Sequence, residues 1–161
     1  MGMNGSVNPA RQGQRALEYF KEGWNCAESV TLAVSEIAER KPPIQCATCF
    51  GGGMSGTGAT CGAVTGALLA LGAMFGRSRL DAGQRLRAYE AGEKFLTEFR
   101  QKFQTMTCEE LTRGEKDHEK RRQICAPYVT AAAEIAAAVI ANHEPRASAG
   151  AGPDAAQSST K

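Results

Sequence analysis

The chain has 161 residues, 42% of them hydrophobic and 22% charged, an ordinary composition for one globular domain with a real core. Its net charge of +2 gives no basic patch that would indicate nucleic-acid binding, and the charge run from Arg113 to Arg122 mixes both signs, as a solvated face does. The longest apolar run, from Ala63 to Phe75, is shorter than the roughly 18 residues that span a bilayer, so we expect no membrane partner.

The six cysteines set the chemical question. No apolar leader segment precedes the first predicted helix, so a secreted disulfide framework is disfavoured and a reducing cytoplasm is the expected compartment. Metal ligation or redox chemistry is then the favoured use of the thiols.

Apolar residues at helical spacing predict two helices near the N-terminus, after a polar segment, residues 1–9, that is expected to be frayed. Gly23 separates the two helices, and Pro42-Pro43 is expected to end the second. The residues that define them are Leu17, Phe20 and Trp24 for the first helix, and Ala27, Val30, Val34 and Ile37 for the second.

Residues 51–58 contain five glycines and are predicted to form a loop of tight turns. A third helix is expected from Thr60 to about Gly76. One of its faces carries only small residues, which favours close packing against a neighbouring helix. These residues are Gly62, Gly66, Ala70 and Ala73.

The C-terminal half is predicted to hold a long fourth helix and a last helix. The fourth runs from about Leu86 to Met106, and the last contains Tyr128, Ala132, Ile135 and Val139. No alternating strand pattern occurs, and residues 144–161 lack large apolar side chains, as a disordered tail does. We therefore expect an all-α bundle of about five helices, forming one domain over residues 10–143.

Three cysteines directly follow a residue that favours helix N-caps. The pairs are Asn25-Cys26, Thr60-Cys61 and Thr107-Cys108, so each cysteine is predicted to lie near the first position of a helix. Glutamates three residues after Asn25 and Thr107 complete the pattern of a capping box. Because helix N-termini favour negative charge, these positions are expected to lower the pKa of a thiol toward neutrality.

Cys125 has no such cap and lies two residues before Pro127. Proline favours the first turn of a helix and disfavours α geometry in the residue before it. A helix can therefore begin at Pro127 with Cys125 just outside its positive end, or it can run through from about Lys116 with a proline inside it. The sequence leaves both arrangements open.

These residues resemble the C-GCAxxG-C-C family of redox-active proteins over roughly residues 15–140. The resemblance rests on Asn25-Cys26-Ala27, then Phe50-Gly51-Gly52-Gly53-Met54, then Cys61-Gly62-Ala63-Val64-Thr65-Gly66-Ala67, and then Cys108 and Cys125. The four cysteines of the family correspond to Cys26, Cys61, Cys108 and Cys125. The resemblance implies a redox role and leaves its mechanism open.

Cys46 and Cys49 lie outside that set and form the one C-x-x-C of the chain. The pair could be a dithiol, half of a metal site, or two small half-buried residues. Pro42-Pro43 precedes it where a thioredoxin-like motif would have a strand. Gly51, Gly53 and Gly56 match a nucleotide-binding G-x-G-x-x-G in letters, but that motif also requires a preceding strand.

Three chemistries use four converging thiols. An iron–sulfur cluster would be ligated by all four cysteines, with Gly62 and the glycine loop letting backbone amides approach. A metal-free protein would instead cycle between dithiol and disulfide, which makes the same four cysteines catalytic. Structural zinc with four cysteine ligands is the third alternative.

The cluster is the first expectation, with Cys46 and Cys49 as secondary metal-ligand candidates. The protein is then an electron carrier or an oxidoreductase that meets a redox partner protein. The sequence leaves open the electron donor, the acceptor, the reduction potential and whether the chain forms a homo-oligomer.

Overall fold

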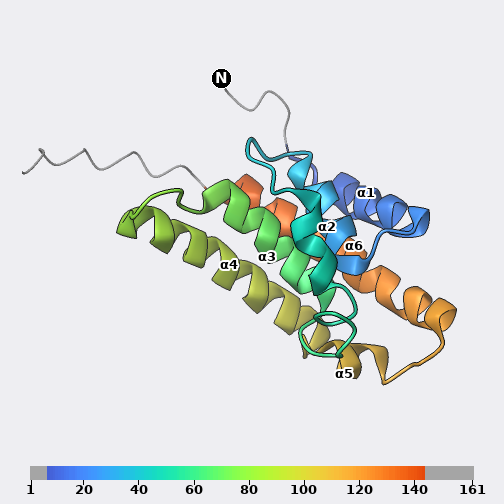
Figure 1. The fold of residues 1–161 in the computed structure, drawn as a ribbon. Coiled ribbons are helices and arrows are strands. Elements are labelled where there is room, and N and C mark those ends of the chain that lie inside the picture. The colour runs from blue at the N-terminus through green and yellow to red at the C-terminus, as the bar shows by residue number, and fades with distance from the viewer. Residues whose placement is uncertain (1–6, 144–161) are drawn as a thin grey trace, which may run out of the picture.

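The computed structural model describes residues 7–143 (Figure 1). Within them the chain forms seven helices and no strand, which confirms the all-α class. Five are the helices expected from periodicity, and the other two, η1 and α5, are too short to give a periodic pattern. In chain order the helices are α1 (Pro9–Glu22), α2 (Cys26–Ser35), η1 (Ile44–Phe50), α3 (Gly62–Phe75), α4 (Ala82–Phe103), α5 (Cys108–Thr112) and α6 (His118–Asn142).

The first helix begins earlier than the sequence suggested. Asn8 caps α1, its side chain accepting from the Arg11 amide at 3.2 Å, and Pro9 is the first helical residue. The fraying expected for residues 1–9 is therefore wrong at Asn8 and Pro9, because a capped proline is a favoured helix start. Residues 1–6 and the predicted tail, residues 144–161, lie outside the described residues.

Gly23 ends α1 in the left-handed conformation, with φ 115°, as its position between two helices predicted. The second helix is shorter than expected: α2 ends at Ser35, several residues before Pro42-Pro43. The prolines instead come directly before η1, for which Pro43 is the N-cap residue.

Of the two arrangements left open for Cys125, the structure has the continuous helix. α6 runs from His118 to Asn142 with Pro127 inside it. Asp117 caps its start, accepting from the Lys120 amide at 2.9 Å. Pro127 has no N–H to donate to the carbonyl four residues earlier, so the helix lacks one of its regular hydrogen bonds beside Cys125.

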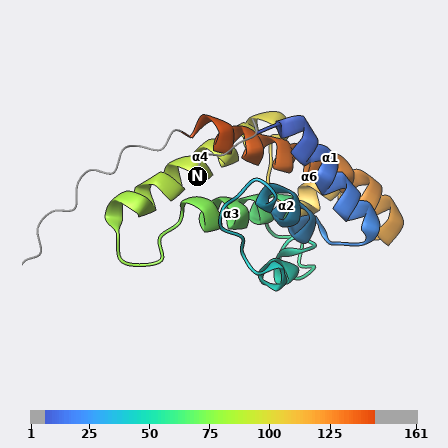
Figure 2. The same ribbon diagram turned by 90° about the horizontal axis from the view of Figure 1, so that it is seen from above.

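The helices pack around an alanine-rich core (Figures 1 and 2). α6 contacts α1, α2, α3 and α4, and α2 lies against both α1 and α3. The largest fully buried apolar side chains are Phe95 and Phe99 of α4 and Leu71 of α3. Small residues let the backbones approach closely, which gives this bundle few large side chains between its helices.

The small-residue face of α3 packs against α2, as expected. A Cβ added at Gly66 would lie 2.4 Å from the Ala27 carbonyl oxygen. The Thr31 hydroxyl of α2 also donates to the Gly66 carbonyl at 3.1 Å. The close packing of two backbones thus fixes where the N-termini of α2 and α3 lie relative to each other.

α6 corrects one expectation from the sequence. By length and composition it is apolar enough to cross a membrane, and it is the one helix within residues 7–143 that is. The core helix of a globular protein passes the same test, and 44% of its most apolar window is buried inside the protein. Its apolar stretch is built mainly from alanines and contains few large aliphatic residues, so it does not stand out in the sequence as a membrane-spanning run.

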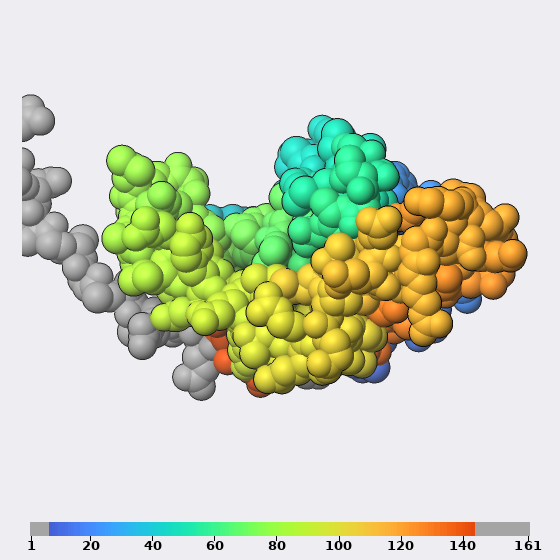
Figure 3. Space-filling view, turned by 90° about the horizontal axis from the view of Figure 1, so that it is seen from below, coloured from blue at the N-terminus to red at the C-terminus, as the bar shows by residue number. Residues whose placement is uncertain are grey.

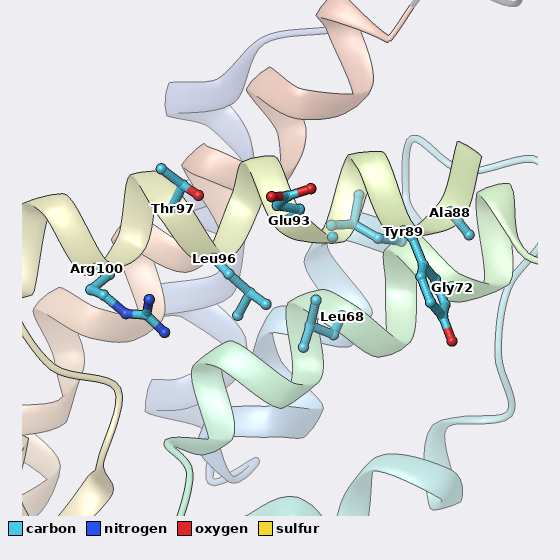
Figure 4. A pocket seen from close by; sticks show the side chains of 10 residues that line it. Leu68, Gly72, Ala88, Tyr89, Glu93, Leu96, Thr97 and Arg100 are labelled. Atoms are coloured by element: carbon cyan, nitrogen blue, oxygen red, sulfur yellow. The ribbon is translucent and has the colours of Figure 1, made fainter. Parts of the chain in front are cut away.

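A groove of about 580 Å³ lies between α3 and α4 (Figure 4). Leu68 and Leu96 line its walls, and Gly72 and Gly92 leave room between the helices. None of the six cysteines lines this groove, so it is separate from the thiol chemistry.

Candidate functional site

Cys26 is the first residue of α2, the position that the sequence predicted. The Asn25 side chain accepts from the amides of Ala27, at 2.9 Å, and Glu28, at 3.0 Å. The Glu28 carboxylate in turn accepts from the Asn25 amide at 2.9 Å. The predicted capping box is confirmed, and it fixes the chain direction at Cys26.

The same two polar residues hold η1 against the start of α2. The Thr48 hydroxyl donates to Glu28 Oε1 at 2.7 Å, and the Asn25 side-chain amide donates to the Thr48 carbonyl at 3.1 Å. The capping-box residues therefore also hold η1, the short helix that leads into the glycine loop, against α2.

Cys61 lies one position earlier than predicted. It is the N-cap residue of α3 and not the first helical residue, and Thr60 makes no side-chain cap. Thr60 instead forms an isolated antiparallel bridge with Thr107, and the Cys61 amide donates to the Met106 carbonyl at 2.8 Å. This pairing draws the start of α3 onto the segment that precedes α5.

Cys108 is the first residue of α5, and its amide donates to the Ala59 carbonyl at 2.6 Å. The capping box predicted at Thr107 is wrong, because the Thr107 side chain makes no cap. The Glu110 carboxylate, which the capping box would have directed at the Thr107 amide, accepts a hydrogen bond from the Thr105 hydroxyl instead. The position of Cys108 is thus fixed by backbone pairing with the end of the glycine loop and not by a side-chain cap.

The glycine loop lies against the segment around α5, where the Glu109 amide donates to the Gly58 carbonyl at 3.0 Å (Figures 1 and 3). Gly53 has φ 71°, and a Cβ there would lie 2.5 Å from the Cys108 Cβ. At Gly62 an added Cβ would lie 2.3 Å from Cys26 Sγ and 2.9 Å from the Phe50 carbonyl oxygen. These two glycines let backbone approach two of the thiols. The sequence indicated Gly62 individually and Gly53 only as one glycine of a loop.

Arg121 is the site residue that the sequence analysis missed. Its guanidinium donates to Cys108 Sγ at 3.2 Å, and this contact raises the pKa of Arg121. Arg122 beside it stacks over the Phe20 ring with 4.0 Å to the centroid. The run from Arg113 to Arg122 is thus not wholly a solvated face, since both arginines are half-buried. The one signal in the sequence was their position four and three residues before Cys125, which places them on the same face of a helix as that cysteine.

The four cysteines of the family motif form one electrostatic cluster. Cys26, Cys61 and Cys108 are buried and Cys125 is half-buried. The negative charges of Cys26 and Cys108 both raise the pKa of Cys61 and of Cys125, and that of Cys108 raises the pKa of Cys26. Together with the contacts of Gly62 with Cys26, of Gly53 with Cys108 and of Arg121 with Cys108, this indicates that α2, α3, α5 and α6 each bring one thiol to the same region.

Burial is the largest influence on the pKa of three of these thiols, Cys26, Cys61 and Cys125. It raises the pKa of Cys61 and of Cys125 to about 12, and it also raises the pKa of Cys26. Backbone amides act in the opposite direction, Gly52 on Cys26 and Ala63 on Cys61, but they are outweighed. The expectation that helix N-termini bring these thiols toward neutral pKa values is therefore wrong at Cys26 and Cys61.

Cys46 and Cys49 are not part of this cluster. Both are exposed on η1, and neither is among the charges that shift the pKa of the other thiols. All six cysteines are free thiols. The structure thus separates the C-x-x-C pair from the four cysteines of the motif.

The donor set fits an iron–sulfur cluster in its chemistry. Such clusters are held by four thiolates and are tuned by hydrogen bonds to sulfur, and this site has four thiols with the Gly52 amide and Arg121 directed at them. Across residues 7–143, no three His, Cys, Asp or Glu side chains are arranged so that they could hold a single metal ion. The fit to a cluster therefore rests on the type and grouping of the four donors and not on a preformed metal-ligand geometry.

Fold and site together define a small helical protein with four clustered, mostly buried thiols and a separate exposed pair. A family model described as "Putative redox-active protein (C_GCAxxG_C_C)" matches residues 24–139. The chain belongs to this family, as the resemblance indicated. No curated protein and no solved structure shows a significant match to it.

Proposed function

We propose that this redox-active protein is an electron carrier whose cysteines Cys26, Cys61, Cys108 and Cys125 ligate an iron–sulfur cluster. The observation that supports this most is the convergence of four thiols from four separate helices on one largely buried site. When bound, such a cluster takes up and releases single electrons. The proposed compartment is the cytoplasm, where thiols stay reduced, and the proposed partner is a redox protein.

The surroundings of the thiols suit a negatively charged group. Arg121 brings a positive charge to Cys108, and the Gly52 amide donates toward Cys26. Gly62 and Gly53 keep side chains out of the space beside two of the sulfurs. These residues would lower the cost of holding negative charge in a buried site, where an uncompensated charge is expensive.

The metal-free dithiol alternative has less support. Thiol–disulfide exchange needs a thiolate as the attacking group. With a pKa of about 12, Cys61 and Cys125 are almost wholly protonated at neutral pH. Metal ligation removes this difficulty, because a coordinated thiol is deprotonated by the metal itself.

Anaerobic purification followed by iron and acid-labile sulfide analysis tests the proposal. We expect iron and sulfide in equal amounts in the wild-type protein, together with visible absorption. We expect both to be lost in Cys26→Ser and retained in the double variant Cys46→Ser/Cys49→Ser, whose exposed thiols serve as the matched control.

Helicity measured by circular dichroism separates loss of the cluster from loss of the fold. A folded Cys26→Ser variant that keeps full iron and sulfide would contradict the ligand assignment. A wild-type protein with neither iron nor sulfide, whose core thiols are lost on mild oxidation, would favour the dithiol alternative. Stoichiometric zinc would favour the structural-zinc alternative.

A further inference from the structure

The exposed C-x-x-C pair has no part in the four-thiol site, yet its geometry suits a reaction of its own. Cys46 and Cys49 lie on η1, a 3-10 helix, and both side chains are exposed. A 3-10 helix has three residues per turn and a rise of about 2 Å per residue, so residues three apart are eclipsed and roughly 6 Å from each other. Disulfides join Cα atoms about 4.4–6.8 Å apart.

The backbone of η1 is fixed by contacts that leave both sulfurs free. The Cys46 amide donates to the Pro43 carbonyl at 3.0 Å, and the Cys49 carbonyl accepts from the Ser55 amide at 2.7 Å. Ala47 between the cysteines is fully buried, and Thr48 bonds Glu28 of α2. A reaction at the sulfurs would therefore break none of the hydrogen bonds that hold η1.

We propose that Cys46 and Cys49 form a surface dithiol that closes reversibly to a disulfide by exchange with the disulfide of a low-molecular-weight thiol. This inference is independent of the cluster proposal, because it uses neither the four buried thiols nor a metal. Preorganisation in one helical turn favours ring closure, since little conformational freedom is lost when the two sulfurs meet.

The exchange balances in two steps. The thiolate of one cysteine attacks a sulfur of the small disulfide, which forms a mixed disulfide and releases one small thiolate. The second cysteine, as thiolate, then attacks the protein sulfur of that mixed disulfide and releases the second small thiolate. The protein dithiol is oxidised by two electrons, the small disulfide is reduced by two, and the two cysteine protons end on the released thiols.

Oxidised glutathione, applied to the full-length protein over a series of ratios to reduced glutathione, tests the inference. Free thiols are alkylated at each ratio and the protein is mapped by tandem mass spectrometry. Because trypsin does not cleave between Lys41 and Pro42, residues 41–77 form one tryptic fragment that also contains Cys61, so fragmentation within this peptide must locate the link. We expect a reversible loss of two hydrogens between Cys46 and Cys49, with Cys61 still alkylatable.

Single variants provide the matched controls. Cys46→Ser and Cys49→Ser each lack the resolving thiol, so we expect each to accumulate one stable glutathione adduct that the wild type does not retain. Wild-type protein that carries separate adducts on both cysteines, that stays reduced at every ratio, or that links either cysteine to Cys61 would overturn the inference. Iron content in the same samples reports on the cluster proposal separately.

Discussion

At the residue scale, burial raises the pKa of three thiols of the site, Cys26, Cys61 and Cys125. Desolvation disfavours the charged form of a thiol, and each neighbouring thiolate disfavours it further. Backbone amides partly offset this effect at Cys61, and the charges of Arg121 and Arg122 do so at Cys125, but the pKa of both thiols still rises to about 12. Without a bound metal, Cys61 and Cys125 are therefore protonated at neutral pH.

This has a consequence for stability at high pH. A thiol whose pKa is 9.0 in the unfolded chain and about 12 in the folded protein is more easily ionised when unfolded. Its contribution to stability is complete below pH 9 and is lost as the pH rises toward 12. We expect the free energy of unfolding of the metal-free protein to fall by up to about 1.4 kcal/mol per pH unit for each such thiol.

Denaturant unfolding between pH 8 and 11 measures this loss. Cys61→Ser is the appropriate comparison, because a serine hydroxyl does not ionise in this range, and its loss of stability should be smaller than that of the wild type. Equal losses in the two proteins would show that Cys61 does not ionise at a raised pKa.

Gly62 provides a second test at this scale. Alanine at this position would place a Cβ against Cys26 Sγ and the Phe50 carbonyl oxygen, so we expect Gly62→Ala to destabilise the protein by roughly 1–3 kcal/mol. Gly72→Ala is the matched control on the same helix, because a Cβ there meets nothing within 4 Å. It should stabilise α3 by roughly 0.5–1 kcal/mol.

Thermal or denaturant unfolding of the two variants and of the wild type measures both changes in stability. If Gly62→Ala were as stable as Gly72→Ala, the close approach of the α3 start to Cys26 would be wrong.

At the element scale, α6 brings both a thiol and a positive charge to the site. Arg121 lies four residues before Cys125, one helical turn away, and contacts Cys108 of α5. Because a cluster gains negative charge on reduction, removal of this guanidinium should make the reduction potential more negative. We expect this shift in Arg121→Gln.

A redox titration followed by visible absorption measures the potential. Lys120→Gln makes the same change in charge at the neighbouring, exposed position and should shift the potential much less. Equal shifts in the two variants would mean that the contact between Arg121 and Cys108 does not tune the site.

The helices themselves were largely predictable, because their apolar residues recur at helical spacing and their starts carry caps. The predicted capping box at Asn25 is confirmed, because it depends only on residues within four positions of one another. The box at Thr107 is not, because Thr105 bonds Glu110 instead and a bridge to Thr60 fixes the segment. Such long-range backbone pairing leaves no periodic signal in the sequence.

The properties of the site were likewise only partly predictable from the sequence. The grouping of the four cysteines followed from the family motif, but the burial that raises the pKa of Cys26, Cys61 and Cys125 depends on how the helices pack. The role of Arg121 depends on the meeting of α5 and α6, whereas its local sequence resembles a solvated charge run. Local caps were thus readable, and properties set by tertiary packing were not.

At the scale of the whole molecule, the four-thiol site exists only when the bundle is folded. Its cysteines come from α2, α3, α5 and α6, and the contact of α2 with α3 and α6 holds the framework together. The exposed pair on η1 needs only one turn of helix. The protein therefore carries two kinds of thiol group, one placed by tertiary structure and one by local structure.

X-ray absorption at the iron edge of anaerobically purified wild-type protein tests the central claim most directly. We expect each iron to be surrounded by sulfur alone, from cysteine thiolates and inorganic sulfide, with a second iron as neighbour. Iron bound by oxygen or nitrogen ligands, or a protein that contains no iron, would contradict the assignment of Cys26, Cys61, Cys108 and Cys125 as cluster ligands.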